Sequence, residues 1–494
     1  MLRSISPLWQ QVIPWLLVTV LAYPILFQLI NELPIQQWDE ARTALNAVGI
    51  WQHHDWIVLR HLNRPDLWNC KPPLWPWLLA ISIKLFGPSE FSIRLPTALA
   101  AFATTLIVFK AGWHWLGSWR AGLLASLVLL TAQGYVMLHV ALTSDFDTLL
   151  TLWTTLGALS WLGYLVTGRS RLVWLTGLSF LLAVLTKGVA GLLFGPGLLL
   201  ATIVIGQARR LFQPAVYGAL AGVLVGGALW YVVRESMAPG YLAAVWEYEL
   251  GGPALHMLEG HTTSFSTYWL LMIEEKFTPW IMPMLLGGAL SYFLPRGSRS
   301  WQLSCYCLCV SFTFLLTISL IQTRLPWYAA PMYPLLALQT AAGLVWVGRM
   351  LEAQLAYKLR SWSQLLVVLV VATPAYWLQL RYVEQVYNAR SRDASTLYGR
   401  HLQAQIRDWP GIQEYIIGVD GKFNDVVELY RQIAKWRYQH HTTIITPWDA
   451  SKTSPGQIVV ACGVDARRPW LRQFRTTVLV RSDSCVTLKL EGWR

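Results

Sequence analysis

Charged side chains are scarce in this sequence. Asp, Glu, Lys and Arg make up 13% of the 494 residues, whereas hydrophobic residues make up 55%. The mean hydropathy of +0.41 is too high for a soluble protein of this size, so that class is excluded. The sequence also has no P-loop, no GxGxxG turn and no internal repeat, and we therefore expect no nucleotide site. We predict an integral membrane protein.

Cysteine is also rare. Six Cys in a chain of this length do not make a disulfide framework. Cys305, Cys307 and Cys309 alternate inside an apolar run, where a helix would spread them around its surface, so we expect ordinary membrane-embedded residues there. Cys462 and Cys485 lie in the polar C-terminal segment, and both a disulfide and two free thiols remain open for them.

What the chain does have is a series of long apolar runs. The first, Ile13 to Ile30, has no small-residue cleavage site after it, so we expect a retained membrane span and not a removed signal peptide. The runs predicted to cross the membrane are roughly 13–30, 91–113, 121–141, 148–166, 172–186, 189–206, 214–233, 268–292, 302–321, 327–347 and 363–380. The predicted fold class is an α-helical polytopic membrane protein of about 11–13 transmembrane helices, with a small C-terminal α/β domain.

The distribution of basic residues predicts the orientation. The formal net charge is +13, and most of this charge lies in short connectors that hold, for example, Arg120, Arg169, Arg210, Arg296 and Arg349. If the N-terminus is cytoplasmic, these connectors are cytoplasmic too, as the positive-inside rule requires. The basic residues are thereby accounted for by the membrane, and no nucleic acid partner is predicted.

The remaining connectors then face outward and hold most of the other polar residues. The longest is the first outer loop, residues 31–90, within which "KPPLWPWLLAISIKLFG" predicts a helix at the interface. From about residue 381, short β-like runs alternate with the helical stretch "NDVVELYRQIAKWRYQ". We divide the chain into a transmembrane domain, 1–380, which includes this loop, and a small extracytoplasmic α/β domain, 381–494.

Ionisable residues gather on the predicted outer face. Asp39 and Glu40 follow the first span; by themselves they are explained by loop solvation or by a helix N-terminus. The others are Lys71, Asp145, Asp147, Lys187 and Arg324. Charges at membrane depth cost roughly 3 kcal/mol or more, so several at one depth should face each other or a polar ligand. Carboxylates and cations at this interface suit a reaction on a lipid-linked phosphate.

The order of short motifs resembles a known superfamily. "WDEART", "HHDW", "CKPPLWPW", "FGPSEF" and "IRLP" are followed by "SDFDTLLTLW", "LTKG", "EGHTTSF" and "RLPWYAAP". This ordered set is similar to the ArnT-like and protein O-mannosyltransferase-like membrane glycosyltransferases of the GT-C superfamily. The resemblance implies transfer of a sugar from polyprenyl phosphate, such as undecaprenyl phosphate, to a lipid, glycan or protein acceptor, with inversion at the anomeric carbon. It also implies an inner-membrane location with the active site on the periplasmic face.

The resemblance implies roles for particular residues. Asp39 matches a catalytic aspartate that activates the acceptor hydroxyl, with Glu40 beside it. The residues implied in binding the lipid phosphate or the sugar are Arg42, Lys71, Asp147, Lys187, His261, Arg324 and Tyr328. No cofactor is clearly implied, although a divalent metal ion is possible, for example at His53–Asp55 or around His256 and His261.

Some positions depart from the family pattern. Cys70 stands where a Glu usually precedes the lysine, Pro253 stands where a phosphate-binding Arg is usual, and Arg324 replaces a Lys. The segment between "HHDW" and "CKPP" is also longer by two residues. These departures argue against assuming a metal site or a lipid A substrate, and they leave alternatives open. The alternatives are a transporter or lipid flippase, an enzyme that uses a diphosphate-linked glycan, and a catalytically inactive scaffold.

Overall fold

The structure is a computed structural model that describes residues 7–251, 264–290, 292–354, 370, 372–388, 394–419 and 424–494. It contains two compact units. The first comprises Met1–Leu29, Leu67–Trp75 and Thr97–Val386, and the second comprises Ile30–Asp66, Pro76–Pro96 and Tyr387–Arg494. The proposed division at residue 380 is based on composition and stays a prediction.

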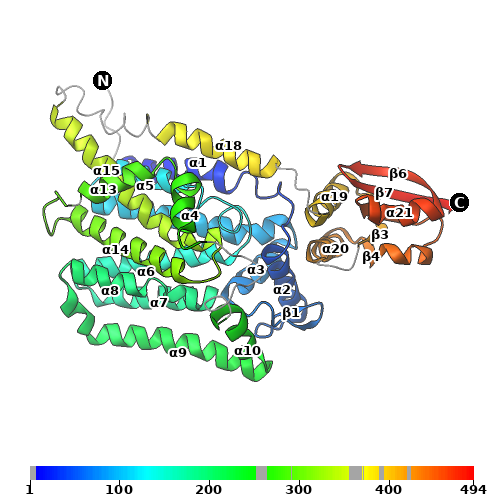
Figure 1. Cartoon of the computed structure of the whole chain (residues 1–494), viewed down its shortest axis with the longest axis horizontal. Coiled ribbons are helices and arrows are strands. Elements are labelled where there is room, and N and C mark those ends of the chain that lie inside the picture. The colour runs from blue at the N-terminus through cyan, green and yellow to red at the C-terminus, as the bar shows by residue number, and fades with distance from the viewer. Residues whose placement is uncertain are drawn as a thin grey trace. The chain divides into compact units, whose positions relative to one another are not determined.

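Helices dominate the chain up to residue 388 (Figure 1). They are α1 (Pro7–Leu26), α2 (Asp39–His53), α3 (Leu74–Phe86), α4 (Glu90–Leu116), α5 (Trp119–Leu130), α6 (Phe146–Thr167), α7 (Ser170–Lys187), α8 (Gly195–Val204), α9 (Pro214–Met237), α10 (Tyr241–Val245), α12 (Thr267–Leu271), α13 (Ile281–Leu290), α14 (Arg299–Leu320), α15 (Tyr333–Gln354) and α18 (Thr373–Asn388). Short 3-10 and π segments join some of them: η1 (Gly188–Leu192), η2 (Ala208–Phe212), η3 (Trp246–Leu250), η4 (Met272–Lys276) and η5 (Pro326–Met332).

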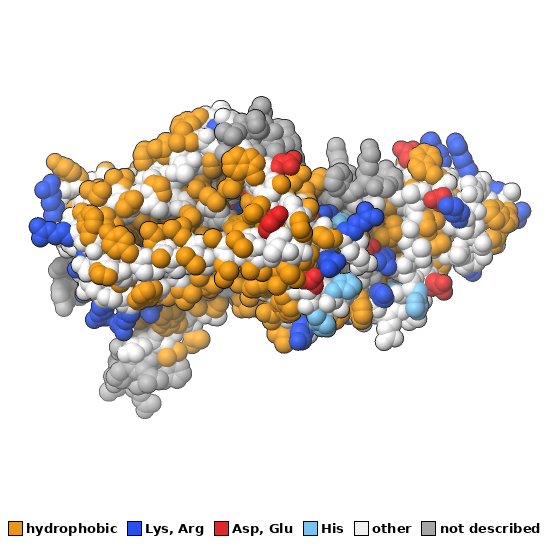
Figure 2. All heavy atoms as spheres, turned by 90° about the horizontal axis from the view of Figure 1, so that it is seen from below, with side chains coloured by type: hydrophobic (Ala, Val, Ile, Leu, Met, Phe, Trp, Pro, Cys, Tyr) orange, Lys and Arg blue, Asp and Glu red, His pale blue; other side chains and the backbone are white. Residues whose placement is uncertain are grey.

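Six helical segments among the described residues are long and apolar enough to cross a membrane: Glu90–Leu116, Phe146–Thr167, Ser170–Leu192, Pro214–Met237, Arg299–Leu320 and Pro326–Met350. Shorter apolar helices are Gln11–Leu26, Leu74–Phe86, Trp119–Leu130 and Gly195–Val204. Hydrophobic side chains cover most of the visible surface of these helices (Figure 2). The predicted polytopic helical class is confirmed, while the total of 11–13 spans stays a prediction.

Two predicted spans differ from the helices observed. The run 121–141 is helical only as far as Leu130, because the chain then turns and Gly134 donates a backbone hydrogen bond to the Lys276 carbonyl. A Cβ on Gly134 would lie 2.0 Å from the Tyr333 hydroxyl, so only glycine allows this close approach. The run 268–292 is divided into α12, η4 and α13, with Pro279, which lacks a backbone N–H, between the last two.

Helices α6 and α7 form an antiparallel pair that separates the polar ends of the first unit. Asp145 caps α6 by accepting a hydrogen bond from the Phe146 N–H, and Gly168 ends α6 in the left-handed conformation with φ of 74°. Arg169 follows directly and Arg210 stacks on Tyr164, so basic residues gather at this end. The opposite end of the same two helices carries the N-terminus of α6 and the C-terminus of α7.

The second unit includes the loop that leads into α2 and a short hairpin, β1 (Arg60–His61) and β2 (Arg64–Pro65). Asp55 accepts hydrogen bonds from the Ile57 and Val58 N–H groups and pairs with Arg60 at 3.2 Å. These contacts give Asp55 a structural part in holding the loop. His53 lies 3.2 Å from the Asn63 side chain, a contact that ties the end of α2 to the hairpin.

The same unit contains a five-stranded mixed sheet with the strand order β4-β3-β5-β7-β6. Its elements are α19 (Ala394–Asp408), β3 (Glu414–Gly418), α20 (Asp425–Tyr438), β4 (His441–Ile445), η7 (Pro447–Lys452), β5 (Ile458–Cys462), α21 (Val464–Gln473), β6 (Phe474–Ser482) and β7 (Cys485–Trp493). Strand β3 is parallel to β4 and β5, and β7 is antiparallel to both of its neighbours. The expected small α/β fold is confirmed.

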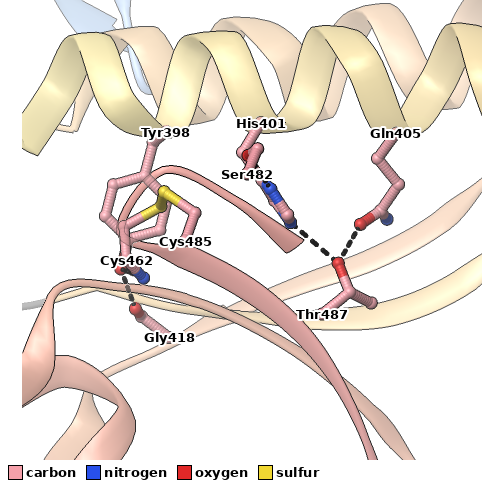
Figure 3. Close-up of a disulfide and its surroundings, with 8 residues drawn as sticks. All are labelled: Tyr398, His401, Gln405, Gly418, Cys462, Ser482, Cys485 and Thr487. Carbon is pink, nitrogen blue, oxygen red and sulfur yellow. Dashed lines mark hydrogen bonds between the residues drawn. A yellow bond between two sulfur atoms is a disulfide. The ribbon is translucent and has the colours of Figure 1, made fainter. Parts of the chain in front are cut away.

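The sheet is covered on both faces. On one face, Trp470 of α21 packs with Val459, Ala461 and Leu490. On the other face, α19 contributes His401, whose ring lies 2.8 Å from the Thr487 hydroxyl (Figure 3). Because successive residues of a strand point to opposite faces, these contacts define a helix–sheet–helix sandwich.

Cys462 and Cys485 form a disulfide between directly paired positions of β5 and β7 (Figure 3). The alternative of two free thiols is therefore excluded. Tyr398 of α19 lies beside it, donating a hydrogen bond to the Gly418 carbonyl and accepting one from the Cys462 N–H. The bridge joins the parallel half of the sheet to its antiparallel half.

Candidate functional site

The first unit holds a buried ion pair at the ends of α6 and α7. The Lys187 ammonium lies 2.5 Å from an Asp147 carboxylate oxygen, and both side chains are at least nine-tenths buried. The sequence places them there because Asp147 belongs to the first turn of α6 and Lys187 to the last turn of α7, and the helices are antiparallel. Each charge suits its helix end, since carboxylates favour N-termini and cations favour C-termini.

A second lysine lies in the same unit and is paired differently. The Lys71 ammonium lies 3.2 Å from Glu249 of η3 and 5.3 Å from the centroid of the Phe146 ring. Both members of this pair keep about a fifth of their side-chain surface exposed, 19% and 24%. The backbone just before Lys71 is fixed, because the Cys70 carbonyl accepts a hydrogen bond from the Tyr241 hydroxyl.

Tyr328 brings the two lysines into one cluster. Its ring lies 4.8 Å from the Lys187 ammonium. The charged groups that act on its hydroxyl are Lys187, Lys71, Glu249 and Asp147. Arg324, four residues earlier, donates from Nε to the Ser319 carbonyl at 3.0 Å. We call Lys71, Asp147, Lys187, Glu249 and Tyr328 the lysine cluster.

A carboxylate–imidazole pair precedes the first turn of α6. The His139 Nδ1 lies 2.9 Å from Asp145, and the imidazole stacks on Trp327 at a centroid distance of 3.9 Å. Burial would raise the pKa of Asp145, but the hydrogen bond and charge of His139 and the charge of Lys187 hold it below its usual value. Asp145 is therefore an ionised acceptor, and this nitrogen and oxygen alone are too few ligands to define a metal site.

In the second unit, the two adjacent carboxylates of the first outer loop have different surroundings. Asp39 is half-buried in the first turn of α2, whereas Glu40 is buried against Arg94. Arg94 donates to both Glu40 oxygens, at 2.7 and 2.9 Å, and to the carbonyls of Ile30, Leu33 and Pro34. The pair therefore fixes the chain that enters α2, and Glu40 has a positioning part.

Arg42 lies one turn further along α2 and binds carboxylates of its own unit. Its guanidinium forms a two-pronged pair with Asp66, both contacts at 2.9 Å, and it lies 3.5 Å from Asp425. His61 joins this network by contacting Asp425 at 2.7 Å. Burial would lower the pKa of Arg42, but Asp66 and Asp425 raise it above its usual value, so the group stays charged.

The structure thus brings together Lys71, Asp147, Lys187 and Tyr328 from the predicted set, and it places Arg324 just before Tyr328. Arg42 and Glu40 are engaged in ion pairs of the second unit. His261 and His256 lie outside the described residues, so their predicted roles remain predictions. Sequence reasoning missed the pairing of Glu249 with Lys71 and the pairing of Arg94 with Glu40. Arg94 did leave a signal, as the one charge at the start of a long apolar run.

Comparison with known proteins gives a consistent result. The family profile "Dolichyl-phosphate-mannose-protein mannosyltransferase" matches residues 70–245. An undecaprenyl phosphate-alpha-4-amino-4-deoxy-L-arabinose arabinosyl transferase from Aeromonas hydrophila is 28% identical over 66% of this chain and 59% of its own length. A second such transferase, from Proteus mirabilis, is 26% identical over 64% of this chain and 56% of its own. The chain therefore matches about three fifths of the length of these relatives.

Solved structures establish the fold. ArnT from Cupriavidus metallidurans bound to undecaprenyl phosphate superposes with a TM-score of 0.68 over 98% of both chains, at 18% identity. The archaeal oligosaccharyltransferase AglB from Archaeoglobus fulgidus gives a TM-score of 0.51 over 86% of this chain and 64% of its own, at 12% identity. The resemblance to ArnT-like and mannosyltransferase-like GT-C glycosyltransferases that the motifs suggested is confirmed, and the chain has the ArnT fold.

Proposed function

We propose that this chain is a membrane glycosyltransferase that takes a sugar from a polyprenyl phosphate carrier, such as undecaprenyl phosphate. The acceptor would be a hydroxyl or phosphate of a lipid, glycan or protein. The observation that carries the proposal is the convergence of Lys71, Lys187 and Tyr328 at the ends of membrane-spanning helices in a chain with the ArnT fold. A carrier with an apolar tail and a phosphate head needs a cationic site at that position.

The two lysines divide the work. Lys187 is held by a buried carboxylate, and separating such a pair is costly, so it provides a fixed positive end to the site. Lys71 is paired with the more exposed Glu249, and such pairs are weak, so an arriving phosphate can replace this partner. We infer that Lys71 binds the phosphate directly, while Lys187 and Tyr328 orient it.

The chemistry is a displacement at the anomeric carbon. The acceptor oxygen forms a bond to that carbon, the bond to the phosphate oxygen breaks, and the polyprenyl phosphate leaves with the electron pair. Lys71 and Lys187 would stabilise the negative charge that develops on the phosphate. A base would take the proton of the acceptor hydroxyl, and attack from the opposite side would invert the configuration.

Asp39 is our candidate for that base. Its assignment rests on the ordered sequence pattern and on its half-buried place in the first turn of α2. The neighbouring Glu40–Arg94 pair would hold this turn in one orientation. Arg42 would act through the same helix, since its guanidinium binds Asp66 and Asp425.

We further propose that the lysine cluster faces the non-cytoplasmic side of the inner membrane. Arg169 and Arg210 lie at the opposite ends of α6 and α7, where the positive-inside rule favours the cytoplasm. The Cys462–Cys485 disulfide supports an oxidising compartment for the C-terminal sheet.

Binding of undecaprenyl phosphate to the full chain in nanodiscs tests the proposed site. Lys71→Met should weaken binding by about tenfold or more, because it removes a charged hydrogen-bond donor. Lys84→Met is the matched control, since Lys84 is an exposed lysine of α3 outside the lysine cluster. Unchanged affinity in Lys71→Met would refute the assignment.

A further inference from the structure

A cavity of about 530 Å³ lies within the second unit, apart from every residue to which the proposed reaction gives a part. It opens between the first outer loop, the turn that joins α3 to α4, and helices α19 and α20. Sites for small molecules typically measure about 300–1,000 Å³, so the cavity can hold a ligand of a few rings.

The charges that line this cavity balance. Glu32 and Glu90 contribute two carboxylates, and Arg407 and Arg437 contribute two guanidinium groups. Glu90 is fixed at one oxygen, which accepts a hydrogen bond from the buried Tyr430 hydroxyl at 2.9 Å. An anion would meet both carboxylates, and an acyl chain would bury four charges without compensation, so neither class of ligand fits.

Aromatic and apolar groups complete the lining. Phe86 and Phe91 stand edge to face at a centroid distance of 5.4 Å, and Tyr438 carries the Arg437 guanidinium 5.9 Å from its ring. Ile406 and Ile433 are buried beneath. The lining therefore alternates apolar surfaces with planar groups that accept or donate hydrogen bonds.

The walls are held rigidly. Ser89 and Ser92 cap the start of α4 by exchanging hydrogen bonds with each other's backbone N–H, at 3.0 and 3.2 Å. Gln403 of α19 donates to the Asn31 carbonyl at 3.0 Å, which joins the helix to the first outer loop. Preorganised walls lower the entropic cost of binding.

We propose that this cavity binds an uncharged carbohydrate, and that this carbohydrate is the glycan portion of the acceptor. A sugar ring has apolar C–H faces and a rim of hydroxyls that both donate and accept. The faces suit Phe86, Phe91 and Tyr438, and the rim suits Glu90 and Arg437. Only the acceptor part of this proposal rests on the proposed function, since the binding of sugar stands by itself.

A glycan array probed with the labelled full chain in nanodiscs tests the binding. The array carries neutral oligosaccharides of hexoses, heptoses and N-acetylhexosamines, together with phosphorylated sugars. We expect binding to a neutral glycan and little competition by inorganic phosphate. Binding to no glycan, or displacement by inorganic phosphate, would overturn the proposal.

Variants then locate the site. Glu90→Gln and Arg437→Gln should each weaken the glycan found on the array by about tenfold, as expected for hydrogen bonds to charged groups. Glutamine at position 90 can still accept the Tyr430 hydrogen bond, so the fold is preserved. Lys452→Gln, in η7 outside the lining, is the control. Equal affinity in all three variants would place the glycan elsewhere and refute the cavity as its site.

Two further readouts separate this inference from the proposed function. With the bound glycan as acceptor, Glu90→Gln should raise KM and leave kcat unchanged, because the cavity binds without reacting. Glu90→Gln should also leave undecaprenyl phosphate affinity unchanged. If sugar binds the cavity while Lys71→Met leaves that affinity intact, the proposed donor site fails and the carbohydrate site stands.

Discussion

At the scale of single residues, the lysine cluster contains two ion pairs of unequal strength. Asp147 and Lys187 are buried, whereas Lys71 and Glu249 are partly exposed. Burial decides which pair can open, because the free energy of a pair in water is small and that of a separated buried charge is large. Substitutions in the two pairs should therefore have different effects.

Glu249→Gln should tighten the binding of undecaprenyl phosphate by about two- to fivefold. The substitution removes a carboxylate that competes with the phosphate for Lys71, and a partly exposed pair is worth about 0.2–1 kcal/mol. Titration of the lipid into the chain in nanodiscs measures the change. Glu247→Gln, an exposed glutamate of the same π segment, should have no effect. Weaker binding in Glu249→Gln would mean that this carboxylate assists the lipid.

Asp147→Asn should lower the free energy of unfolding by about 3–5 kcal/mol, because it leaves Lys187 charged and buried without its carboxylate. Adding Lys187→Met should recover a large part of this loss. Thermal unfolding in detergent, followed by near-UV circular dichroism, compares the two variants. Additive losses in the double variant would show that the residues do not act as a pair.

At the scale of elements, the C-terminal sheet has an internal pH sensor. His401 of α19 is buried between the hydroxyls of Ser482 and Thr487, and burial lowers its pKa to about 4. An unfolded histidine has a pKa of about 6.5. Between these values the unfolded chain binds more protons than the folded one, so stability falls as the pH falls from about 6.5 to 4.

The sheet should accordingly lose up to about 3 kcal/mol of stability across that window, and none from pH 8 to 7. Hydrogen exchange of the full chain, corrected for the intrinsic rate, can follow segments of β6 and β7. His401→Gln should flatten the dependence, whereas the exposed His441, at the start of β4, should be neutral when replaced by Gln. A pH-independent protection factor in the unmodified chain would contradict the shift.

Elements with simple periodicity could be predicted from the sequence, and those set by distant contacts could not. The runs around Ile416, Ile444, Val460 and Leu488 predict strands because β-branched and apolar residues cluster there, and strands are present. The run 121–141 stays apolar after Leu130, but Gly134 and its contact with Tyr333 end the helix. Such an ending depends on a residue about 200 positions away, which no local pattern encodes.

The same limit applies to the candidate site. Motif order singled out Lys71 and Lys187 because charges in apolar surroundings are unusual. It gave no account of their partners, since Glu249 lies far along the chain in a segment with several carboxylates. The pairing of Arg42 with Asp66 was missed for the same reason, because neither spacing nor helix periodicity relates them.

At the scale of the whole molecule, orientation can be tested by labelling. Asp465→Cys places a thiol at a highly exposed position of α21, and Arg209→Cys places one in the exposed η2 segment. In intact cells, a membrane-impermeant maleimide should label the first and spare the second until the membrane is permeabilised. The unmodified chain gives the background. The reverse pattern would place the lysine cluster on the cytoplasmic side.

The whole account implies one reaction, and Asp39 is its most exposed assumption. The direct measurement is transfer of labelled sugar from a panel of undecaprenyl phosphate sugars to cell-envelope acceptors by the full chain in proteoliposomes. The account predicts transfer from at least one donor and a loss of about 100-fold or more in Asp39→Asn, with Asp465→Asn unchanged. Full activity in Asp39→Asn would contradict the general-base assignment. Movement of the lipid across the bilayer without any transfer would contradict the glycosyltransferase itself and favour a flippase.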